Sequence, residues 1–411
     1  MSSNVNAIQL APDLGSWILF PGKSEDETVY LVGSQKVDKY LTVPAKRYSL
    51  VMEIFERLRR GDEPDEIEAD LETRGMVVNV REFCRMLARK ELLDWESMAE
   101  PDEADSAGEG RWGALFGQLR ALSWQVFSLN LEPFRRALAA VAAPTLTLLI
   151  TAAILSSGAI LLQGGISRPA LRQMSQQVLG SNGLLWMTLL NALVLPFFVL
   201  LHESAHAVAA ARGEVYPRRL SMRAYLLIAP YFSLQLPGLY TLPVGKRLLA
   251  IAAGPLMDLT LGNLSLLAAR AIGGAWMPWL ALLALSNYSR FIFNLLPILP
   301  MTDGYAFLSQ AIFREIDIRG HATKEFRRWQ QKKSNRFRGK YVAFFLFNIV
   351  VAGVILIGGL MQVNTILARW MRAIGVLPTG PLTWWGVVAL IGLDALCLYL
   401  ARKRLRILIG W

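Results

Sequence analysis

The sequence contains little cysteine, histidine or charge. Its 411 residues include two cysteines, Cys84 and Cys397, and three histidines. Two cysteines so far apart exclude a disulfide framework and a cysteine-rich metal site. Charged residues make up 18% of the chain and hydrophobic residues 54%, a composition that excludes an ordinary soluble protein. The first 16 residues lack a basic start and an apolar core, so we expect no cleavable signal peptide.

Acidic residues are scarce after residue 110. Residues 1–110 hold 13 basic and 23 acidic residues, a net charge of −10, and the rest of the chain holds the other 30 basic and 9 acidic residues, a net charge of +21. This asymmetry predicts an acidic soluble domain followed by a membrane domain with basic loops. Basic loops between apolar runs indicate membrane topology, so no nucleic-acid partner is expected.

Apolar runs of roughly 20 residues dominate the second part of the chain and predict helices that span a lipid bilayer. The expected fold is a polytopic α-helical membrane protein of about six transmembrane helices, with an N-terminal soluble α+β domain of winged-helix type. The spans are expected at residues 137–162, 184–211, 247–271, 279–299, 341–361 and 384–401. The basic loops predict that both termini are cytoplasmic, in a bacterial-type inner or plasma membrane.

Three segments are expected along the chain. Residues 1–98 form the cytoplasmic domain, with two strands within 28–43, three helices near 45–60, 67–74 and 79–90, and a return strand at 92–95. Residues 99–136 combine an acidic linker with an interfacial amphipathic helix over 111–136, and residues 137–411 form the transmembrane domain with its core at 184–308.

One motif in the second predicted span carries recognisable chemistry. His202 and His206 are separated by four residues, so they lie one turn apart on one face of a helix. Two imidazoles so placed can bind one zinc ion, and Glu203 can act as base toward a water molecule that zinc activates. The alternative is a pair of structural histidines beside a chance glutamate, which explains poorly three polar side chains after an apolar run.

A catalytic zinc site needs a third protein ligand. The remaining histidine, His321, lies in a highly charged loop and is expected to be a surface residue. Asp303 is the better candidate, because it follows Pro297 and Pro300 at the end of a predicted span, where carboxylates are rare and usually functional. The alternative for Asp303 is the N-cap of the following helix.

The pairing of HESAH with the later segment NLLPILPMTDG resembles the site-2 protease family of intramembrane zinc metalloproteases. The resemblance covers residues 184–308 and implies that His202, His206 and Asp303 bind zinc while Glu203 is the general base. It also implies that Asn294 hydrogen-bonds the substrate backbone or the oxyanion. Two departures are the nine-residue spacing from Asn294 to Asp303 and the presence of Thr302 before the aspartate.

Two further segments are similar to parts of this family. The stretch AGPLMD resembles its glycine-proline span start, with Asp258 in place of an asparagine. Asp258 is expected either to orient a ligand histidine from behind or to cap a turn, and both readings stay open. Residues 225–242 resemble a re-entrant edge segment along which a substrate strand could lie; the alternative is a membrane-surface loop.

The order of strands and helices over residues 29–95 resembles the PqqD-like peptide-recognition domains of peptide-maturation enzymes. The resemblance rests on YLV and KYLTV, the long first helix and the ending CRMLARKELLDW. It implies that the domain binds a peptide by strand addition to its sheet edge. The alternative is a domain used for assembly or regulation.

The sequence therefore predicts a membrane-embedded zinc endopeptidase that cleaves a membrane-inserted peptide or a single-span protein, in peptide maturation or export. A different hypothesis is a non-proteolytic membrane partner of a maturation or export system that retains a structural zinc site. A third is a metal transporter that uses the same ligands. A glutamate beside two histidines suits hydrolysis better than permeation.

Overall fold

The computed structural model describes residues 9–94 without 23, residues 123–164, 183–225, 229–297 and 302–331, and residues 339–353 with three single-residue gaps. Contacts divide the chain into two compact units. The first comprises Met1–Ser106, Leu119–Leu295 and Gln310–Arg314, and the second comprises Ala107–Gln118, Leu296–Ser309 and Glu315–Trp411.

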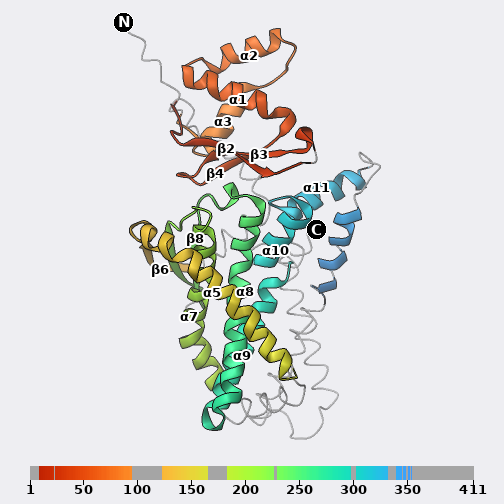
Figure 1. Ribbon diagram of the computed structural model, residues 1–411. Coiled ribbons are helices and arrows are strands. Elements are labelled where there is room, and N and C mark those ends of the chain that lie inside the picture. The colour runs from red at the N-terminus through yellow and green to blue at the C-terminus, as the bar shows by residue number, and fades with distance from the viewer. Residues whose placement is uncertain are drawn as a thin grey trace, which may run out of the picture. The chain divides into compact units, whose positions relative to one another are not determined.

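The described residues 9–94, which we call the front domain, belong to the first unit and combine small sheets with three helices (Figure 1). Strands β2 (Leu14–Phe20), β3 (Val29–Ser34) and β4 (Lys39–Pro44) form an antiparallel sheet in that order, and β1 (Gln9–Leu10) pairs with β5 (Leu93–Asp94). Helices α1 (Ala45–Arg60), α2 (Pro64–Thr73) and α3 (Val80–Arg89) follow the sheet. Their apolar faces meet in one core that includes Val32, Phe55, Leu71 and Leu87.

Local sequence signals explain the ends of these helices. Helix α1 begins after Pro44 and ends at Gly61, whose φ of 93° is the left-handed conformation that glycine adopts without strain. Asn79 caps α3 by accepting a hydrogen bond from the Glu82 N–H at 2.7 Å. The three helices lie close to where the sequence predicted them, and the return strand forms β5, but β1, its partner, and β2 were not predicted.

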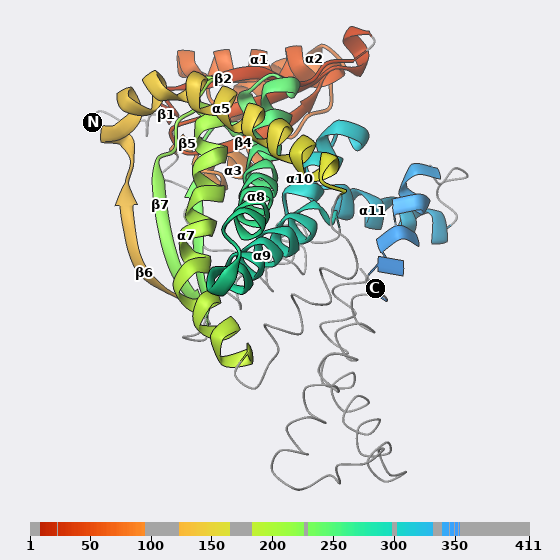
Figure 2. The ribbon, with the colours of Figure 1, turned by 60° about the horizontal axis from the view of Figure 1, so that its bottom comes forward.

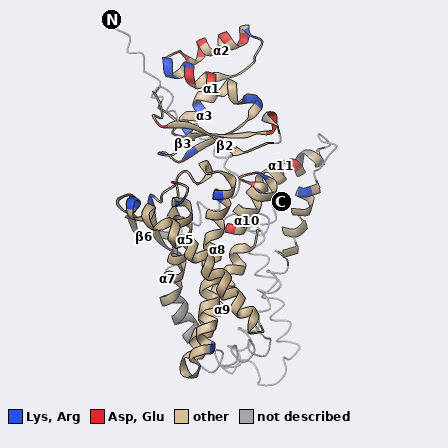
Figure 3. Cartoon of the chain, viewed as in Figure 1, with Lys and Arg blue, Asp and Glu red and all other residues tan. Residues whose placement is uncertain are grey.

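Four long helices and a third sheet belong to the rest of the first unit. Helices α5 (Arg135–Leu162), α7 (Gly183–Ala211), α8 (Val244–Ile272) and α9 (Met277–Leu295) pack against one another. Strands β6 (Ser123–Asn130), β7 (Arg219–Tyr225) and β8 (Ala229–Gln235) form an antiparallel sheet, of which Figure 2 shows β6 beside β7. Strand β8 packs against α7. Figure 3 shows that α5, α8 and α9 carry few charged residues along most of their length, whereas α1 and α2 carry many.

The predicted fold class is wrong. Among the described residues, two helical segments are long and apolar enough to cross a membrane, Glu132–Leu162 and Val244–Ile272, instead of about six, and three-stranded sheets accompany the helices. The predicted fourth span forms α9, but polar residues such as Asn287, Arg290 and Asn294 lower its hydropathy below that of a spanning segment. The predicted span at 341–361 is described only as far as residue 353, and that at 384–401 lies outside the described residues.

The predicted interfacial helix is also wrong where its residues are described. Residues 123–130 form strand β6, which pairs with β7 from Ser123 opposite Tyr225 to Asn130 opposite Arg219. Tertiary pairing with β7 outweighs the helical spacing of the aromatic residues in this stretch. The sequence that resembled a re-entrant segment forms β8 and the short helix η5 (Leu239–Thr241).

The front domain contacts the loop before α8 within the first unit. The Arg247 side chain is fully buried, and it donates hydrogen bonds to the carbonyl oxygens of Leu19 and Tyr240, each at 2.8 Å. Its guanidinium lies 5.2 Å from the centroid of the Phe20 ring, a cation–π contact. Further hydrogen bonds join Gln35 to Thr241, Asp38 to the Gly238 N–H, the Lys36 carbonyl to Arg218 and the Pro21 carbonyl to Arg314.

The described part of the second unit contains α10 (Asp303–Leu308) and α11 (Ile318–Gln330). A buried tyrosine on α10 is hydrogen-bonded to the start of α11. The Tyr305 hydroxyl donates to Asp317 Oδ1 at 2.8 Å and accepts from the Arg319 N–H at 3.0 Å. Burial and the Asp317 carboxylate raise the pKa of Tyr305 above its usual value, so its hydroxyl stays protonated as a donor.

Candidate metal centre

Helix α7 positions the two histidines of the predicted motif. His202 and His206 are 6% and 9% exposed, and the alanines that follow them pack in an apolar cluster with α5 and α8. Their rings meet edge to face with centroids 4.8 Å apart. The i, i+4 spacing and the burial of this face by α8 therefore bring both imidazoles to one point.

The Nδ1 atom of each ring faces an acceptor. His206 Nδ1 lies 2.7 Å from the Ala250 carbonyl oxygen, and His202 Nδ1 lies 2.9 Å from Asp258 Oδ2. A carbonyl or a carboxylate can only accept, so each Nδ1 carries the hydrogen. In the neutral rings both Nε2 atoms are then unprotonated, which is the tautomer that metal-binding histidines use.

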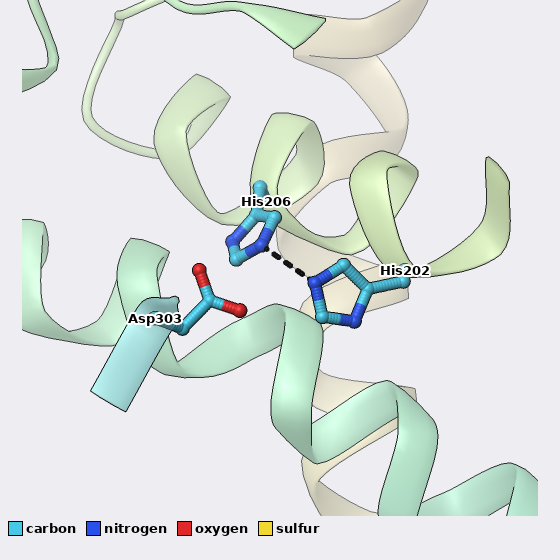
Figure 4. Close-up of side chains that lie close together, drawn as sticks. All are labelled: His202, His206 and Asp303. Atoms are coloured by element: carbon cyan, nitrogen blue, oxygen red, sulfur yellow. Dashed lines mark hydrogen bonds between the residues drawn. The ribbon is translucent and has the colours of Figure 1, made fainter. Parts of the chain in front are cut away.

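The two Nε2 atoms lie 3.2 Å apart (Figure 4). A hydrogen bond between them would require a proton on one Nε2 atom and would leave a bare Nδ1 facing an acceptor. Two nitrogens at about 2.0–2.1 Å from one tetrahedral ion would be separated by about 3.3 Å. The spacing therefore matches two ligands of one metal ion.

A glycine on α8 leaves room at this point. A Cβ atom added to Gly254 would overlap His206 Nε2 and would lie 2.5 Å from His202 Nε2. Gly254 thus allows both imidazole rings to approach the backbone of α8 closely, and a side chain of any size at this position would displace them.

Asp303 is the third member of the group. One carboxylate oxygen of Asp303 and one ring nitrogen of each histidine all lie within 4.8 Å of one another. The N-cap of α10 is Thr302, whose Oγ1 accepts from the Tyr305 N–H and donates to the Leu296 carbonyl. Asp303 is therefore the first residue inside the helix, and its side chain is not needed as the cap. Pro300, which we predicted to break this segment, lies outside the described residues.

Asp258, Arg290 and Asn294 form a polar cluster behind His202. Asp258 is fully buried; its Oδ2 accepts from Asn294 Nδ2 at 3.1 Å as well as facing His202, and its Oδ1 accepts a short bond from Arg290. Of the two readings of Asp258, the contact with His202 matches orientation of a ligand histidine. The Asn294 amide donates to Asp258, a partner that the sequence did not indicate.

Other predicted residues are placed as follows. Glu203 is half-buried on α7 between the histidines and interacts electrostatically with Arg290. The His321 side chain is 54% exposed and lies 3.6 Å from Glu315, apart from the metal-binding group.

Sequence reasoning missed Arg290 and the structural reason for Gly254. A signal existed for Arg290, because a lone arginine in an apolar helix must find a partner, and it stands one turn before Asn294 on the same face. The AGPLMD stretch marked Gly254 by resemblance, but its contact with the two histidines depends on how α8 packs on α7.

Comparisons with known proteins found no match for this chain among family models, curated proteins or solved structures.

Proposed function

We propose that the chain is a membrane-embedded zinc metalloprotease with His202, His206 and Asp303 as zinc ligands and Glu203 as the general base. The observation that carries the proposal is the pair of Nε2 atoms 3.2 Å apart, each ring anchored through Nδ1, with a glutamate adjacent on the same turn. Bound zinc would act as a Lewis acid toward a peptide carbonyl and toward water.

The residues of the chain supply the remaining chemistry. Glu203 accepts the proton of the attacking water and returns it to the leaving amine. Asp258 and the Ala250 carbonyl hold the two imidazoles in the ligand tautomer. Asn294 is the candidate donor to the substrate backbone or oxyanion, and its amide donates a hydrogen bond to Asp258.

The apolar surface of α5 supports a membrane location. Ala142, Leu146, Leu149 and Ala153 face the other helices, while Leu148, Ile154, Leu155 and Leu162 are 66–90% exposed. Contiguous exposed apolar side chains of this size are costly in water and favourable in lipid. The front domain contacts the start of α8, so in this proposal that end of α8 lies on the same side of the membrane as the front domain. The basic loops of the sequence support a cytoplasmic location for both termini.

The substrate class follows from the location: a membrane-inserted peptide or a single-span protein, cleaved in peptide maturation or export. We further propose that the front domain binds the peptide. In support, β4 is an edge strand that pairs only with β3 among the described strands, so it offers backbone groups for strand addition.

Metal content tests the centre of the proposal. Purified protein in detergent should carry about one zinc per chain, and His206→Ala and Asp303→Ala should each lose it. Glu203→Gln should keep the zinc but lose proteolysis, which is measured by comparing membrane-protein fragments in cells that express either form.

The outcomes separate the alternatives. Zinc-free wild type after supplementation would refute the metal centre. Zinc with equal function in Glu203→Gln would instead favour the non-proteolytic partner with a structural zinc site.

A further inference from the structure

A buried ion pair lies directly behind the histidines. The Arg290 side chain on α9 is 16% exposed, and the Asp258 carboxylate on α8 is fully buried. Arg290 Nη1 is buried without a hydrogen-bond partner in the part of the chain that the structure describes. Burying a charge and leaving a donor unpaired both cost stability, so this arginine is expected to have a role beyond packing.

One nitrogen of Arg290 joins three helices. Nη2 donates to Asp258 Oδ1 on α8 and to the Phe198 carbonyl oxygen on α7 at 3.1 Å. Phe198 lies one turn before His202 on α7. The guanidinium therefore fixes α9 to both helices that carry the histidines and their anchors.

The same bond restrains the Asp258 carboxylate. With Oδ1 held by Arg290, Oδ2 is turned toward His202 Nδ1 at 2.9 Å. Without Arg290, the Asn294 amide at 3.1 Å from Oδ2 would remain as a restraint on rotation of the carboxylate about its Cβ–Cγ bond, and the acceptor of the imidazole would be held less firmly. Because ring orientation decides where the Nε2 lone pair points, the effect reaches the metal position.

We propose that Arg290 is a positioning residue of the metal centre, which holds His202 in its ligand orientation through Asp258. The inference rests on the proposed zinc site. The Glu203 carboxylate also acts electrostatically on Arg290.

Geometry and charge make opposite predictions for Arg290→Met. Removing a positive charge near a divalent cation should strengthen binding by electrostatics alone. Losing the orientation of a ligand histidine should weaken zinc binding by about 10–100-fold. The sign of the change in zinc affinity therefore separates positioning from a mere charge effect.

The experiment measures the zinc dissociation constant of the full-length protein by competition with a chromophoric chelator, together with the absorption spectrum of the Co²⁺-substituted form. Arg290→Met should weaken zinc binding and shift the Co²⁺ bands, and Arg290→Lys, which keeps a donor, should recover part of both. Arg270→Met is the matched control, since Arg270 lies in the last turn of α8 and bonds Gln163.

A double variant keeps the test valid if Arg290→Met folds poorly. Asp258→Asn with Arg290→Met removes both charges of the buried pair. If Arg290 acts through Asp258, the double variant should bind zinc no more weakly than Asp258→Asn alone.

The outcomes are distinguishable from failure of the proposed function. Wild-type protein that binds zinc, with equal or tighter binding and an unchanged Co²⁺ spectrum in Arg290→Met, would overturn the inference and leave the metal site intact. Additive losses in the double variant would also overturn it. Wild type that binds no zinc would remove the proposed function itself.

Discussion

Gly254→Ala should abolish metal binding while leaving helix α8 at least as stable as before. Alanine favours a helix interior over glycine by about 0.8–1.0 kcal/mol. The added Cβ, however, would overlap His206 Nε2 and lie 2.5 Å from His202 Nε2, where Cβ contacts under 3.0 Å are essentially never seen. The rings must therefore move by roughly half an ångström or more, whereas metal–ligand distances tolerate about 0.2 Å.

A shift of that size displaces at least one ligand. We expect zinc affinity to fall at least ~100-fold, or about 2.7 kcal/mol. The assay is zinc content after desalting, with the dissociation constant from chelator competition and the thermal midpoint measured on the same preparations.

Two other glycines of α8 provide controls. A Cβ at Gly245 meets nothing within 4 Å, so Gly245→Ala should keep both zinc and stability. A Cβ at Gly262 would lie 2.9 Å from the Tyr288 ring, so Gly262→Ala should strain helix packing without touching the histidines. Wild-type zinc affinity in Gly254→Ala would refute the site geometry.

Three further perturbations have defined outcomes. Asp258→Asn should weaken zinc binding about 10–100-fold by chelator competition, because the amide is a poorer partner for the imidazole. Tyr305→Phe should lower the thermal midpoint by the equivalent of about 1–3 kcal/mol, because it removes two hydrogen bonds of a buried hydroxyl, to Asp317 and from the Arg319 N–H. Burial raises the pKa of the Cys84 thiol from 9.0 to about 11. Its contribution to stability should therefore be complete below pH 9 and be lost as the pH rises toward 11, and Cys84→Ala should show a smaller alkaline loss in denaturant titrations.

Each of these has a clear contrary result. Unchanged zinc affinity in Asp258→Asn would mean that the carboxylate does not support His202. An unchanged midpoint in Tyr305→Phe would show that its hydroxyl bonds add nothing net. An alkaline loss equal to that of the wild type in Cys84→Ala would assign the pH dependence to other groups.

Local patterns predicted the parts of the structure that depend on neighbouring residues. The helical spacing of Phe55 and Leu58 and the stop at Gly61 were sufficient for α1. The i, i+4 histidines placed two side chains on one face of α7 for the same reason.

Features that depend on distant partners were not predictable in this way. Residues 123–130 read as an amphipathic helix, yet they are a strand because β7, almost 100 residues later, supplies its hydrogen bonds. The apolar composition of α9 suggested a spanning helix, but Arg290 and Asn294 face Asp258 across a helix interface. Hydropathy counts residues without showing which of them are paired, so within the described residues it predicted a spanning segment where α9 is too polar for one.

The attachment of the front domain has a consequence for how the two parts can diverge. Three of its bonds, from Arg247, Arg218 and Arg314, end on main-chain oxygens of Leu19, Lys36 and Pro21. Carbonyl oxygens are present whatever side chain a residue carries. The three hydrogen bonds therefore depend on the backbone conformation of the front domain and not on which side chains it has at these positions. Mutations can therefore alter the side chains of the front domain while its attachment to the helices persists, whereas loss of Arg247 would leave a void that few substitutions in the front domain could repair.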